Sequence, residues 1–580
     1  MPSKHPARVI VTVLALILCA PAAETLAQED DPVLHIMQEE IAREMDVLKS
    51  QDPPAYFLSY RIDDTYTSTV SASLGALTGS DDRHRRHLTV QLRVGDYTMD
   101  NTREIRGGRS FSFEIPQFTA VPIESNDEAL RMVLWNATNQ RYRKAAKKYQ
   151  EVRANTAVKV EAEDQSEDFA MIPAPEQFVD PPLDASSLLP DRTVWEQKLK
   201  RYSRGFLSSE HIFEGDARLS FTAERKRIAT SEGAAVAENR VATRLILSAT
   251  IKCTDGMELP LHMSYFAYDI SGMPSDEEVL TDVREMVETL TAMREAPTVE
   301  PFTGPALLSG EAAGVFFHEI FGHRVEGHRQ KKETEGQTFK KMEGESVLPD
   351  HMSVVFDPTL NRYNGQDLNG YYVFDDEGVR GQKVTVVDHG ILNDFLMSRT
   401  PFEKHPSSNG HGRAQTGFQP VSRQSNLIVE TDKPRSEEEL REGLLEECRK
   451  QDKEFGLYFK NVRGGFTRTG RYSPNAFNVT PTEVYRIYVD GRPDELVRGV
   501  DLVGTPLVMF SNITAAGTAP AIFTGTCGAE SGGVPVSAVS PPLLVSQIEV
   551  QKKSKSQERA PLLPRPDQDS STPQPRERTY

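Results

Sequence analysis

Two histidines and a glutamate near the middle of this 580-residue chain are its clearest candidates for chemistry. They are His318, Glu319 and His323, in the pattern His-Glu-x-x-x-His. Two imidazoles and a neighbouring carboxylate on one helix are typical of a hydrolytic zinc site, because ring nitrogens bind the metal and the carboxylate takes a proton from water. The motif alone leaves an alternative open, in which a buried helix has histidines that bond to backbone carbonyls.

The spacing of the two histidines requires a helix that is irregular at its end. Residues five positions apart lie about 140° around an ideal helix, so a regular helix would not bring both rings to one ion. Gly322 directly precedes His323, and glycine permits the last turn to widen or unwind. The sequence therefore predicts a helix near residues 310–328 that is capped by Ser309 and distorted at Gly322.

A catalytic zinc also needs a third protein ligand and an open position for water. Seven side chains beyond the motif carry suitable donor atoms: Glu326, His328, His351, His389, His405, His411 and Cys527. Glycines near Cys527 on both sides would let the backbone come close to a metal, and thiolate is a strong zinc donor. A lone cysteine is also commonly a small buried hydrophobe. Spacing alone therefore leaves the third ligand open.

The first 300 residues predict a domain of mixed helices and strands. Apolar residues recur at three- and four-residue steps from Asp31 to Lys49, and a long helix is expected from Asp127 to Val152. Between them, residues 55–104 alternate β-branched and aromatic residues with polar ones, which favours strands. An acidic, proline-rich passage at 163–191 indicates a linker or an extended arm, and a second helix-then-strands passage follows at 193–268.

A domain boundary is expected near residue 298, where the character of the sequence changes. Ser275 and Glu278 have capping-box spacing and open a helix that runs to about Glu295. Beyond it, many short strands with Gly and Asn/Asp turns are predicted, together with a helix near 436–450. The predicted domains are 28–298 and 299–550.

Both ends of the chain carry segments that we do not expect to belong to these domains. Lys4 and Arg8 precede an apolar run at 9–20, which is the charge order of a secretory signal peptide at 1–27. Such a signal predicts a periplasmic or secreted mature protein, and an uncleaved anchor is the alternative. Prolines and scattered charges predict a disordered tail at 551–580.

The composition excludes some kinds of partner. The 85 acidic and 67 basic side chains give a formal charge of -18, and this field repels phosphate backbones and anionic lipid. We therefore expect no nucleic-acid partner and no stable membrane insertion after signal cleavage. With 4 cysteines the chain cannot be a disulfide scaffold of the small secreted type, so packing must stabilise it. Cys253 and Cys448 would either pair or remain buried.

Four blocks of the C-terminal half resemble the TldD/PmbA family of bacterial metalloproteases, and they occur in the family's order. The blocks are 318–327, 375–382, 409–413 and 525–536. The resemblance spans about 310–540, whereas the first 300 residues show no motif that matches. It implies that His318, His323 and Cys527 bind Zn²⁺ and that Glu319 is the catalytic base.

The resemblance also implies a fold, a partner and a substrate. It predicts an α+β protein in which a mixed α/β N-terminal domain precedes a β-rich C-terminal metal-binding domain. The family forms dimers, so a homodimer or a heterodimer with a family paralogue is expected, with a cleft that admits an unfolded peptide as an extended strand.

The expected activity is that of a zinc-dependent peptidase in which Glu319 deprotonates water for attack on a peptide carbonyl. An alternative of a different class is a non-catalytic binding or scaffold subunit of an envelope complex, as the family's motif-lacking partners suggest. A metal-dependent hydrolase that acts on non-peptide bonds also remains open on chemical grounds.

Two of the matching blocks carry charged residues with more than one possible role. Asp375, Asp376 and Glu377 either orient a ligating histidine or form an acidic turn between strands, and we favour the turn. Arg413 either holds a carboxylate or carbonyl of a peptide or lies in a mobile surface loop.

Overall fold

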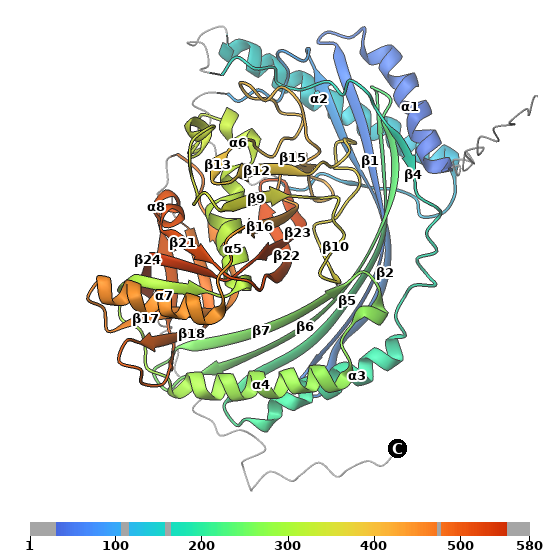
Figure 1. Ribbon diagram of the computed structural model, residues 1–580. Helices are drawn as coiled ribbons and strands as arrows, with labels where there is room; N and C mark the ends of the chain where they lie inside the picture. The colour runs from blue at the N-terminus through green and yellow to red at the C-terminus, as the bar shows by residue number, and fades with distance from the viewer. Residues whose placement is uncertain (1–30, 106–114, 157–163, 472–476, 554–580) are drawn as a thin grey trace, which may run out of the picture.

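The computed structural model describes four stretches of the chain: residues 31–105, 115–156, 164–471 and 477–553. The predicted signal peptide at 1–27 and the predicted tail from 554 onward lie outside the described residues. Gln551 and Lys552, which we assigned to the tail, instead form the end of the last strand. The described chain is the expected α+β protein, with an N-terminal mixed sheet domain and a β-rich C-terminal domain (Figure 1).

The N-terminal domain is built on one long, curved sheet. Its main strands are β1 (Ala55–Ser73), β2 (Ala76–Val94), β5 (Ile212–Thr230), β6 (Ala235–Lys252) and β7 (Glu258–Ala267). They lie antiparallel in the order β2-β1-β5-β6-β7, and the short β3 (Thr119–Ala120) pairs with β2. Buried and partly exposed residues alternate along β5, as the two-residue period of a strand requires. From the proline-rich passage, β4 (Gln177–Val179) pairs in parallel with β6, so that passage is an extended arm.

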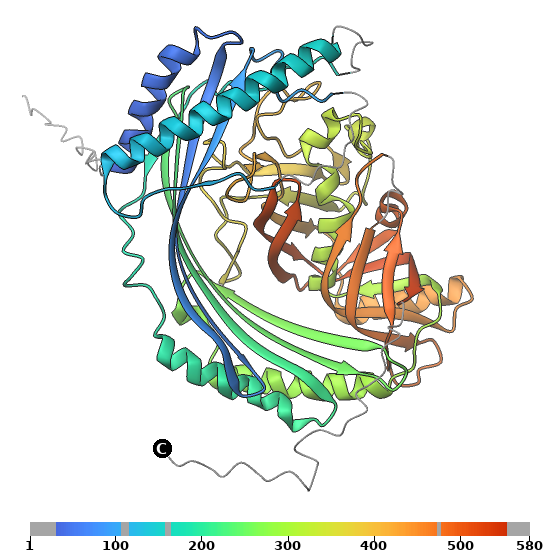
Figure 2. The same ribbon diagram turned by 180° about the vertical axis from the view of Figure 1, so that it is seen from behind.

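Four helices cover the convex face of this sheet (Figures 1 and 2). They are α1 (Pro32–Leu48), α2 (Asp127–Thr156), α3 (Arg192–Gly205) and α4 (Asp276–Glu295). The first two pack around one apolar core and the last two around another. Both bonds of the predicted capping box between Ser275 and Glu278 are present at the start of α4. Because helices cover the convex face, the concave face is left to the C-terminal domain.

The C-terminal domain contains a barrel-like sheet. Its strands are β8 (Phe302–Leu308), β17 (Phe455–Thr467), β18 (Phe477–Tyr488), β19 (Glu495–Val497), β20 (Val500–Gly504), β21 (Ile513–Ala516) and β24 (Leu543–Lys552). The order β17-β8-β24-β20-β18 is closed by an additional pairing of β17 with β18. The predicted helix near 436–450 is α7 (Glu437–Lys450), capped by Ser436, and it packs against β8, β17 and β24.

A second sheet of this domain stands beside the barrel. Its strands are β9 (Met352–Phe356), β12 (Val384–Asp388), β13 (Ile391–Leu392), β16 (Asn426–Thr431), β22 (Ala521–Ala529) and β23 (Gly532–Ser540). The order β13-β12-β9-β16-β23-β22 makes β22 an edge strand. The helix α5 (Gly310–Ile320) lies between the two sheets, in contact with β17 on one side and with β22 and β23 on the other. Any site on α5 is therefore enclosed by both sheets.

Two further features limit what the fold can do. Within the described residues, no helix combines the length and the apolar character that a bilayer crossing requires. Cys253 and Cys448 are free, buried thiols that belong to different apolar clusters, one under α3 and α4 and the other beside α7. The two cysteines therefore remain buried and do not pair with each other.

Candidate metal centre

The helix α5 carries the first histidine directly over the edge of the second sheet. Ser309 caps the helix as predicted, because its hydroxyl accepts a hydrogen bond from the backbone N–H of Ala312 at 3.2 Å. The glycines Gly310 and Gly314 allow the close approach, since a Cβ on Gly310 would lie 2.6 Å from the carbonyl oxygen of Ser540. The absence of side chains here lets α5 rest on the β22–β23 hairpin.

The end of α5 has the irregularity that the histidine spacing required. The helix stops at Ile320, a 3-10 turn covers Gly322–Arg324, and a short helix α6 (Gly327–Lys331) follows. The single helix expected near 310–328 is therefore wrong, whereas the distortion at Gly322 is confirmed. A Cβ on Gly322 would collide with the side-chain amide of Gln424, so a larger residue would have to displace Gln424.

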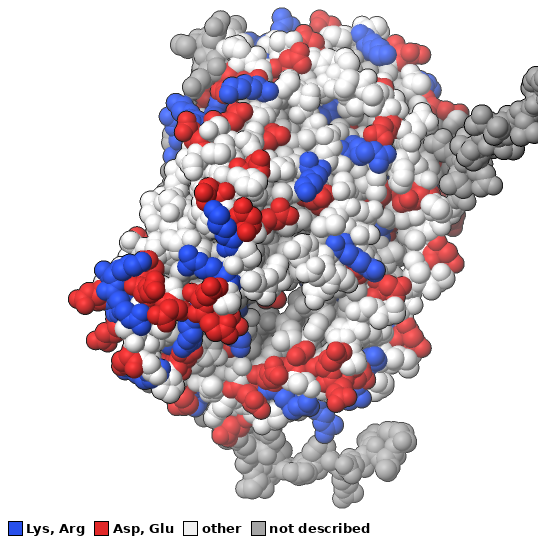
Figure 3. Space-filling model, viewed as in Figure 1, with Lys and Arg blue, Asp and Glu red and all other residues white. Residues whose placement is uncertain are grey.

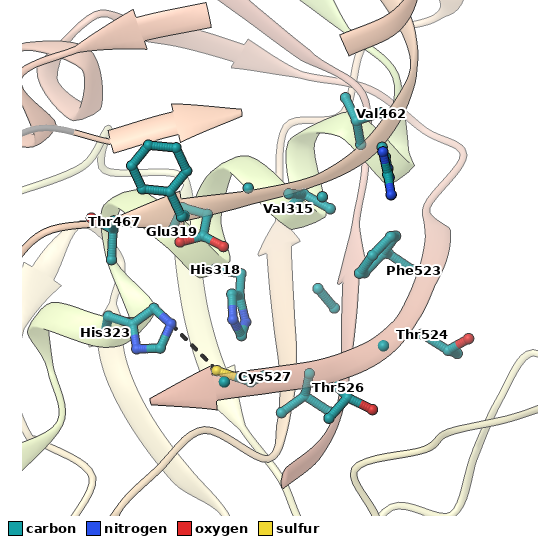
Figure 4. A pocket seen from close by; sticks show the side chains of 18 of the residues that line it. Val315, His318, Glu319, His323, Val462, Thr467, Phe523, Thr524, Thr526 and Cys527 are labelled. Carbon is teal, nitrogen blue, oxygen red and sulfur yellow. Dashed lines mark hydrogen bonds between the residues drawn. The ribbon is translucent and has the colours of Figure 1, made fainter. Parts of the chain in front are cut away.

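The break brings both histidines together with a remote cysteine. The ligand atoms of His318, His323 and Cys527 all lie within 4.8 Å of one another. The two rings stand nearly perpendicular with centroids 5.0 Å apart, and Sγ of Cys527 lies 3.3 Å from Nε2 of His323. Figure 4 shows the three side chains converging from α5, the 3-10 turn and β22. No second group of this kind occurs elsewhere among the described residues.

The electrostatics of this cluster favour the ligand form of the cysteine. Burial alone would raise the pKa of the Cys527 thiol, but the neighbouring His323 and His318 lower it well below its ordinary value. Burial alone would lower the pKa of His323, but Cys527 and Glu326 raise it to about 10. A thiolate with two neutral imidazoles is a donor set that suits zinc, and metal binding would displace the proton of His323. The residues present therefore fit a zinc ion.

Glu319 lies next to the cluster, and one of its carboxylate oxygens accepts no hydrogen bond from the described residues. Its side chain is 6% exposed, and its Oε2 has no hydrogen-bond partner in the described structure. Burial raises the pKa of this carboxyl above its ordinary value, although His318 and His323 act in the opposite direction. Gly465 of β17 makes room for it, because a Cβ there would lie 2.7 Å from Cγ of Glu319. A buried oxygen without a partner is suited to accept a proton or a ligand.

The other six candidates for the third ligand have different roles. Glu326 contacts the far side of the His323 ring, and His328 bonds to Glu530. His411 is fully buried and bonds to Asn409 and Ser425. The remaining histidines pair with carboxylates away from the cluster, His351 with Asp350, His389 with Asp388, and His405 with Asp394.

A cleft with a volume of about 1200 Å³ opens over the cluster. Its lining comes from α5, β17 and β22 and also from β6 and β7 of the N-terminal sheet, including Arg244 and His262. Figure 3 shows this face of the molecule hollowed between the C-terminal domain and the lower end of the N-terminal sheet. Nothing in our sequence analysis connected Arg244 or His262 with the site. The paired Gly464 and Gly465 inside a strand were a usable signal, because such glycines mark close approach.

The two charged blocks that the sequence left open are both structural. Asp375 accepts hydrogen bonds from the backbone N–H groups of Glu377, Val379 and Gly412, which confirms a turn. Asp376 forms ion pairs with Arg61 and Lys226 of the N-terminal sheet. None of these contacts joins a ligating histidine.

Arg413 fits neither of the two roles that we considered. Its side chain is buried, donates to the carbonyl oxygen of Gln424 and stacks over the ring of Tyr372. Both expected roles, capture of a peptide carboxylate and membership of a mobile surface loop, are therefore wrong. A buried guanidinium that is bonded to the backbone supports the loop from within.

Comparison with known sequences agrees with this arrangement. Residues 302–552 match the family model of the PmbA/TldA metallopeptidase C-terminal domain. A metalloprotease of Archaeoglobus fulgidus is 34% identical over 263 residues, which are 45% of this chain and 56% of that protein. A zinc metalloprotease TldD homolog of Saccharolobus solfataricus is 24% identical over 249 residues, which are 42% of this chain and 51% of that protein. The chain thus spans about half the length of these curated relatives.

The fold as a whole is similar to solved structures. The crystal structure of TldE from Thermococcus kodakarensis superposes with a TM-score of 0.58 and 12% sequence identity. The match covers 88% of this chain and 99% of that chain. The same overall fold is therefore present in a protein with a very different sequence.

Proposed function

Because the chain belongs, through residues 302–552, to the TldD/PmbA family of metalloproteases, we propose that it is a zinc-dependent peptidase that cleaves unfolded peptides. The observation that carries the proposal is the convergence of His318, His323 and Cys527 beside the free oxygen of Glu319, at the base of a large cleft. A buried carboxylate next to three metal-ligand side chains, two with nitrogen and one with sulfur donors, is compatible with metal-assisted hydrolysis, in which the carboxylate acts as general base.

Each side chain of the candidate centre has a separate role in the proposed reaction. His318, His323 and Cys527 would hold the ion, and bound Zn²⁺ supplies a Lewis acid that lowers the pKa of water and polarises a carbonyl. Glu319 receives the proton of the attacking water on its free Oε2 and passes it to the leaving amine.

The substrate that suits this cleft is a peptide in extended form. The edge strand β22 lines the cleft along its length and carries Cys527. An edge strand has backbone groups that no neighbouring strand pairs, and an extended peptide can form main-chain hydrogen bonds with such groups. On β22 the carbonyl oxygens of Gly525 and Cys527 already accept from the side chains of Asn369 and Arg423. Main-chain binding grips any unfolded chain with little dependence on its side chains.

We also propose that the protein is exported and acts as a dimer, either of identical chains or with a family paralogue. Export rests on the apolar run at 9–20 that follows two basic residues. The dimer rests on the resemblance to the family alone. Fractionation of cells that produce the full chain tests the first proposal, and light scattering of the purified protein tests the second.

The role of Glu319 is tested with the substitution Glu319→Gln, which keeps the size of the side chain and removes the proton acceptor. We expect full zinc content and a fall in kcat of about 10²- to 10⁴-fold on a fluorogenic unstructured peptide. Glu311→Gln is the matched control, because Glu311 also lies on α5 and lines the same cleft about two turns before His318. Peptidase activity equal to wild type in Glu319→Gln would falsify the assignment.

A further inference from the structure

Glu326 is a buried carboxylate that contacts one ligand of the metal centre from behind. Its side chain has no exposed surface, and its Oε2 lies 3.3 Å from Nδ1 of His323. Two guanidinium groups meet the same carboxylate. Nε of Arg329 donates to Oε2 at 2.8 Å, and Nε of Arg423 lies 3.6 Å from Oε1.

Both arginines also contact the β22–β23 hairpin, which carries the third ligand, Cys527. Arg423 donates to the carbonyl oxygen of Cys527 itself at 2.6 Å. It also donates to the hydroxyl of Ser531 at 2.7 Å, in the turn between β22 and β23, and to the carbonyl oxygen of Gly532 at 2.9 Å, at the start of β23. One side chain thus holds the ligand residue and the turn of its hairpin together.

The second arginine reaches the hairpin through a carboxylate. Nη2 of Arg329 donates to Oε2 of Glu530 at 2.7 Å, and Nε2 of His328 lies 2.5 Å from Oε1 of the same residue. Glu530 stands three positions after Cys527, and its side chain is 34% exposed where it lines the cleft. The hairpin therefore has a second attachment to α6, at its tip.

The carboxylates of Glu326 and Glu530 balance the guanidinium groups of Arg329 and Arg423, so removal of any one of the four charges leaves another without its partner. Arg423 and Glu326 are fully buried and Arg329 is 8% exposed. A buried charge is tolerated when it is paired and hydrogen-bonded, and loss of one partner leaves the other uncompensated.

We propose that Glu326 is a positioning residue which, through Arg329 and Arg423, fixes His323 and the Cys527 hairpin in one arrangement, with Glu530 as the outer attachment. This proposal rests on the metal centre of the proposed function. It adds a network of buried charged side chains that holds the Cys527 thiolate close to the metal. The edge strand β22 needs such a brace, because it has a strand neighbour on one side only. Residues that orient metal ligands in this way commonly change metal affinity by about 10- to 100-fold.

The test compares the wild-type protein with Glu326→Gln, Glu530→Gln and Glu335→Gln. Glu335 is the matched control, because it faces the same Arg329 at 3.4 Å from Nη1 but has no contact with the hairpin among the interactions of the described residues. Two readouts apply to each protein, namely the rate at which a chelator removes Zn²⁺ and the thiolate-to-metal absorption band of the Co²⁺-substituted protein. The second readout reports on the Cys527 bond directly and is independent of turnover.

We expect Zn²⁺ loss to be roughly 10- to 100-fold faster in Glu326→Gln and Glu530→Gln, with a weakened cobalt–thiolate band, and unchanged in Glu335→Gln. If Glu326→Gln fails to fold, the proposal is tested with Glu530→Gln. The side chain of Glu530 is partly exposed, so loss of its charge should not prevent folding. Wild-type metal retention and absorption in Glu530→Gln, or equal losses in Glu335→Gln, would overturn the positioning role and leave the proposed function intact. A wild-type protein that binds no zinc would overturn both.

Discussion

Cys527 and His323 are in direct contact within the candidate centre. With 3.3 Å between sulfur and nitrogen, each stabilises the charged form of the other, so the thiolate stays ionised inside the protein. An oxidant can modify a free thiolate of this kind, whereas a bound metal protects the sulfur from oxidation. The same pair that prepares the site for zinc therefore makes the metal-free chain sensitive to oxidation.

Gly322 is the residue on which the meeting of the two histidines depends. We expect Gly322→Ala to lower the free energy of unfolding by about 1–3 kcal/mol and to reduce zinc content, because the new methyl group must displace Gln424, which donates to the carbonyl oxygen of His318 at 3.2 Å. Thermal unfolding and zinc analysis of the purified variant measure both effects.

Gly528→Ala is a suitable control for that substitution. Gly528 is the residue after Cys527, and a Cβ there meets no atom within 4 Å in the described structure. We expect its zinc content and stability to equal those of the wild type. If Gly322→Ala behaves like Gly528→Ala, the collision at Gln424 is not what shapes the end of α5.

The sequence predicted the first two ligands and left the third open for a physical reason. His318, Glu319 and His323 are close in sequence, so residue type and helical geometry sufficed to propose them. Cys527 lies 204 positions from His323, and only the pairing of β22 with β23 and the packing of α5 bring the two together. Among seven candidates, the resemblance to the family identified the cysteine, whereas spacing did not.

At the scale of elements, α5 carries the first ligand, His318, and begins at the capping residue Ser309. Ser309→Ala removes the cap of this helix, and we expect the free energy of unfolding to fall by about 1 kcal/mol, because a backbone N–H loses its acceptor. Zinc content should remain that of the wild type, since the first ligand lies more than two turns further on. Chemical denaturation combined with metal analysis checks both statements.

The matched change is Ser275→Ala, which removes the corresponding cap from α4, a helix of the N-terminal domain that takes no part in the cleft lining. Both variants should lose similar stability. Loss of zinc in Ser309→Ala, with none in Ser275→Ala, would mean that the start of α5 orients the ligands as well as stabilising the helix.

Helices that depend on residues close in sequence could be predicted, whereas the pairing of strands that are far apart in sequence could not. Apolar periodicity and capping residues predicted α1, α2, α4 and α7, because these depend on neighbours a few positions away. The strand β8 pairs with β17 in parallel and with β24 in antiparallel orientation, and no local pattern specifies such partners. The break after α5 was predicted from chemistry, while periodicity alone suggested one continuous helix.

On the scale of the whole molecule, mostly buried ion pairs join the N-terminal sheet to the C-terminal domain. Asp376 meets Arg61 at 3.1 Å and Lys226 at 3.2 Å. Burial alone would raise the pKa of Asp376, but the two cations outweigh it and lower the pKa to about 2.

The ion pairs of Asp376 predict a specific dependence of stability on pH. Because the folded pKa of Asp376, about 2, lies below the value of about 3.9 for a free aspartate, its contribution is present above pH 4 and is lost as the pH falls toward 2. We expect the stability difference between wild type and Asp376→Asn to shrink by roughly 1 kcal/mol between pH 6 and pH 3. Urea denaturation at several pH values measures this difference.

An exposed ion pair between the same domains serves as the comparison. Arg380 and Glu176 are each more than 40% exposed, and such pairs contribute little. Glu176→Gln should therefore differ from wild type by the same small amount at every pH. A constant difference for Asp376→Asn as well would contradict a stabilising role for the buried carboxylate.

The central claim is that three side chains from two distant parts of the chain hold one zinc ion, and the zinc content of wild type and Cys527→Ala tests it most directly. Both purified proteins are analysed for bound metal and then incubated with an unstructured peptide. The account predicts stoichiometric zinc and cleavage for the wild type, with loss of both in Cys527→Ala. Undiminished zinc and cleavage in Cys527→Ala would contradict it.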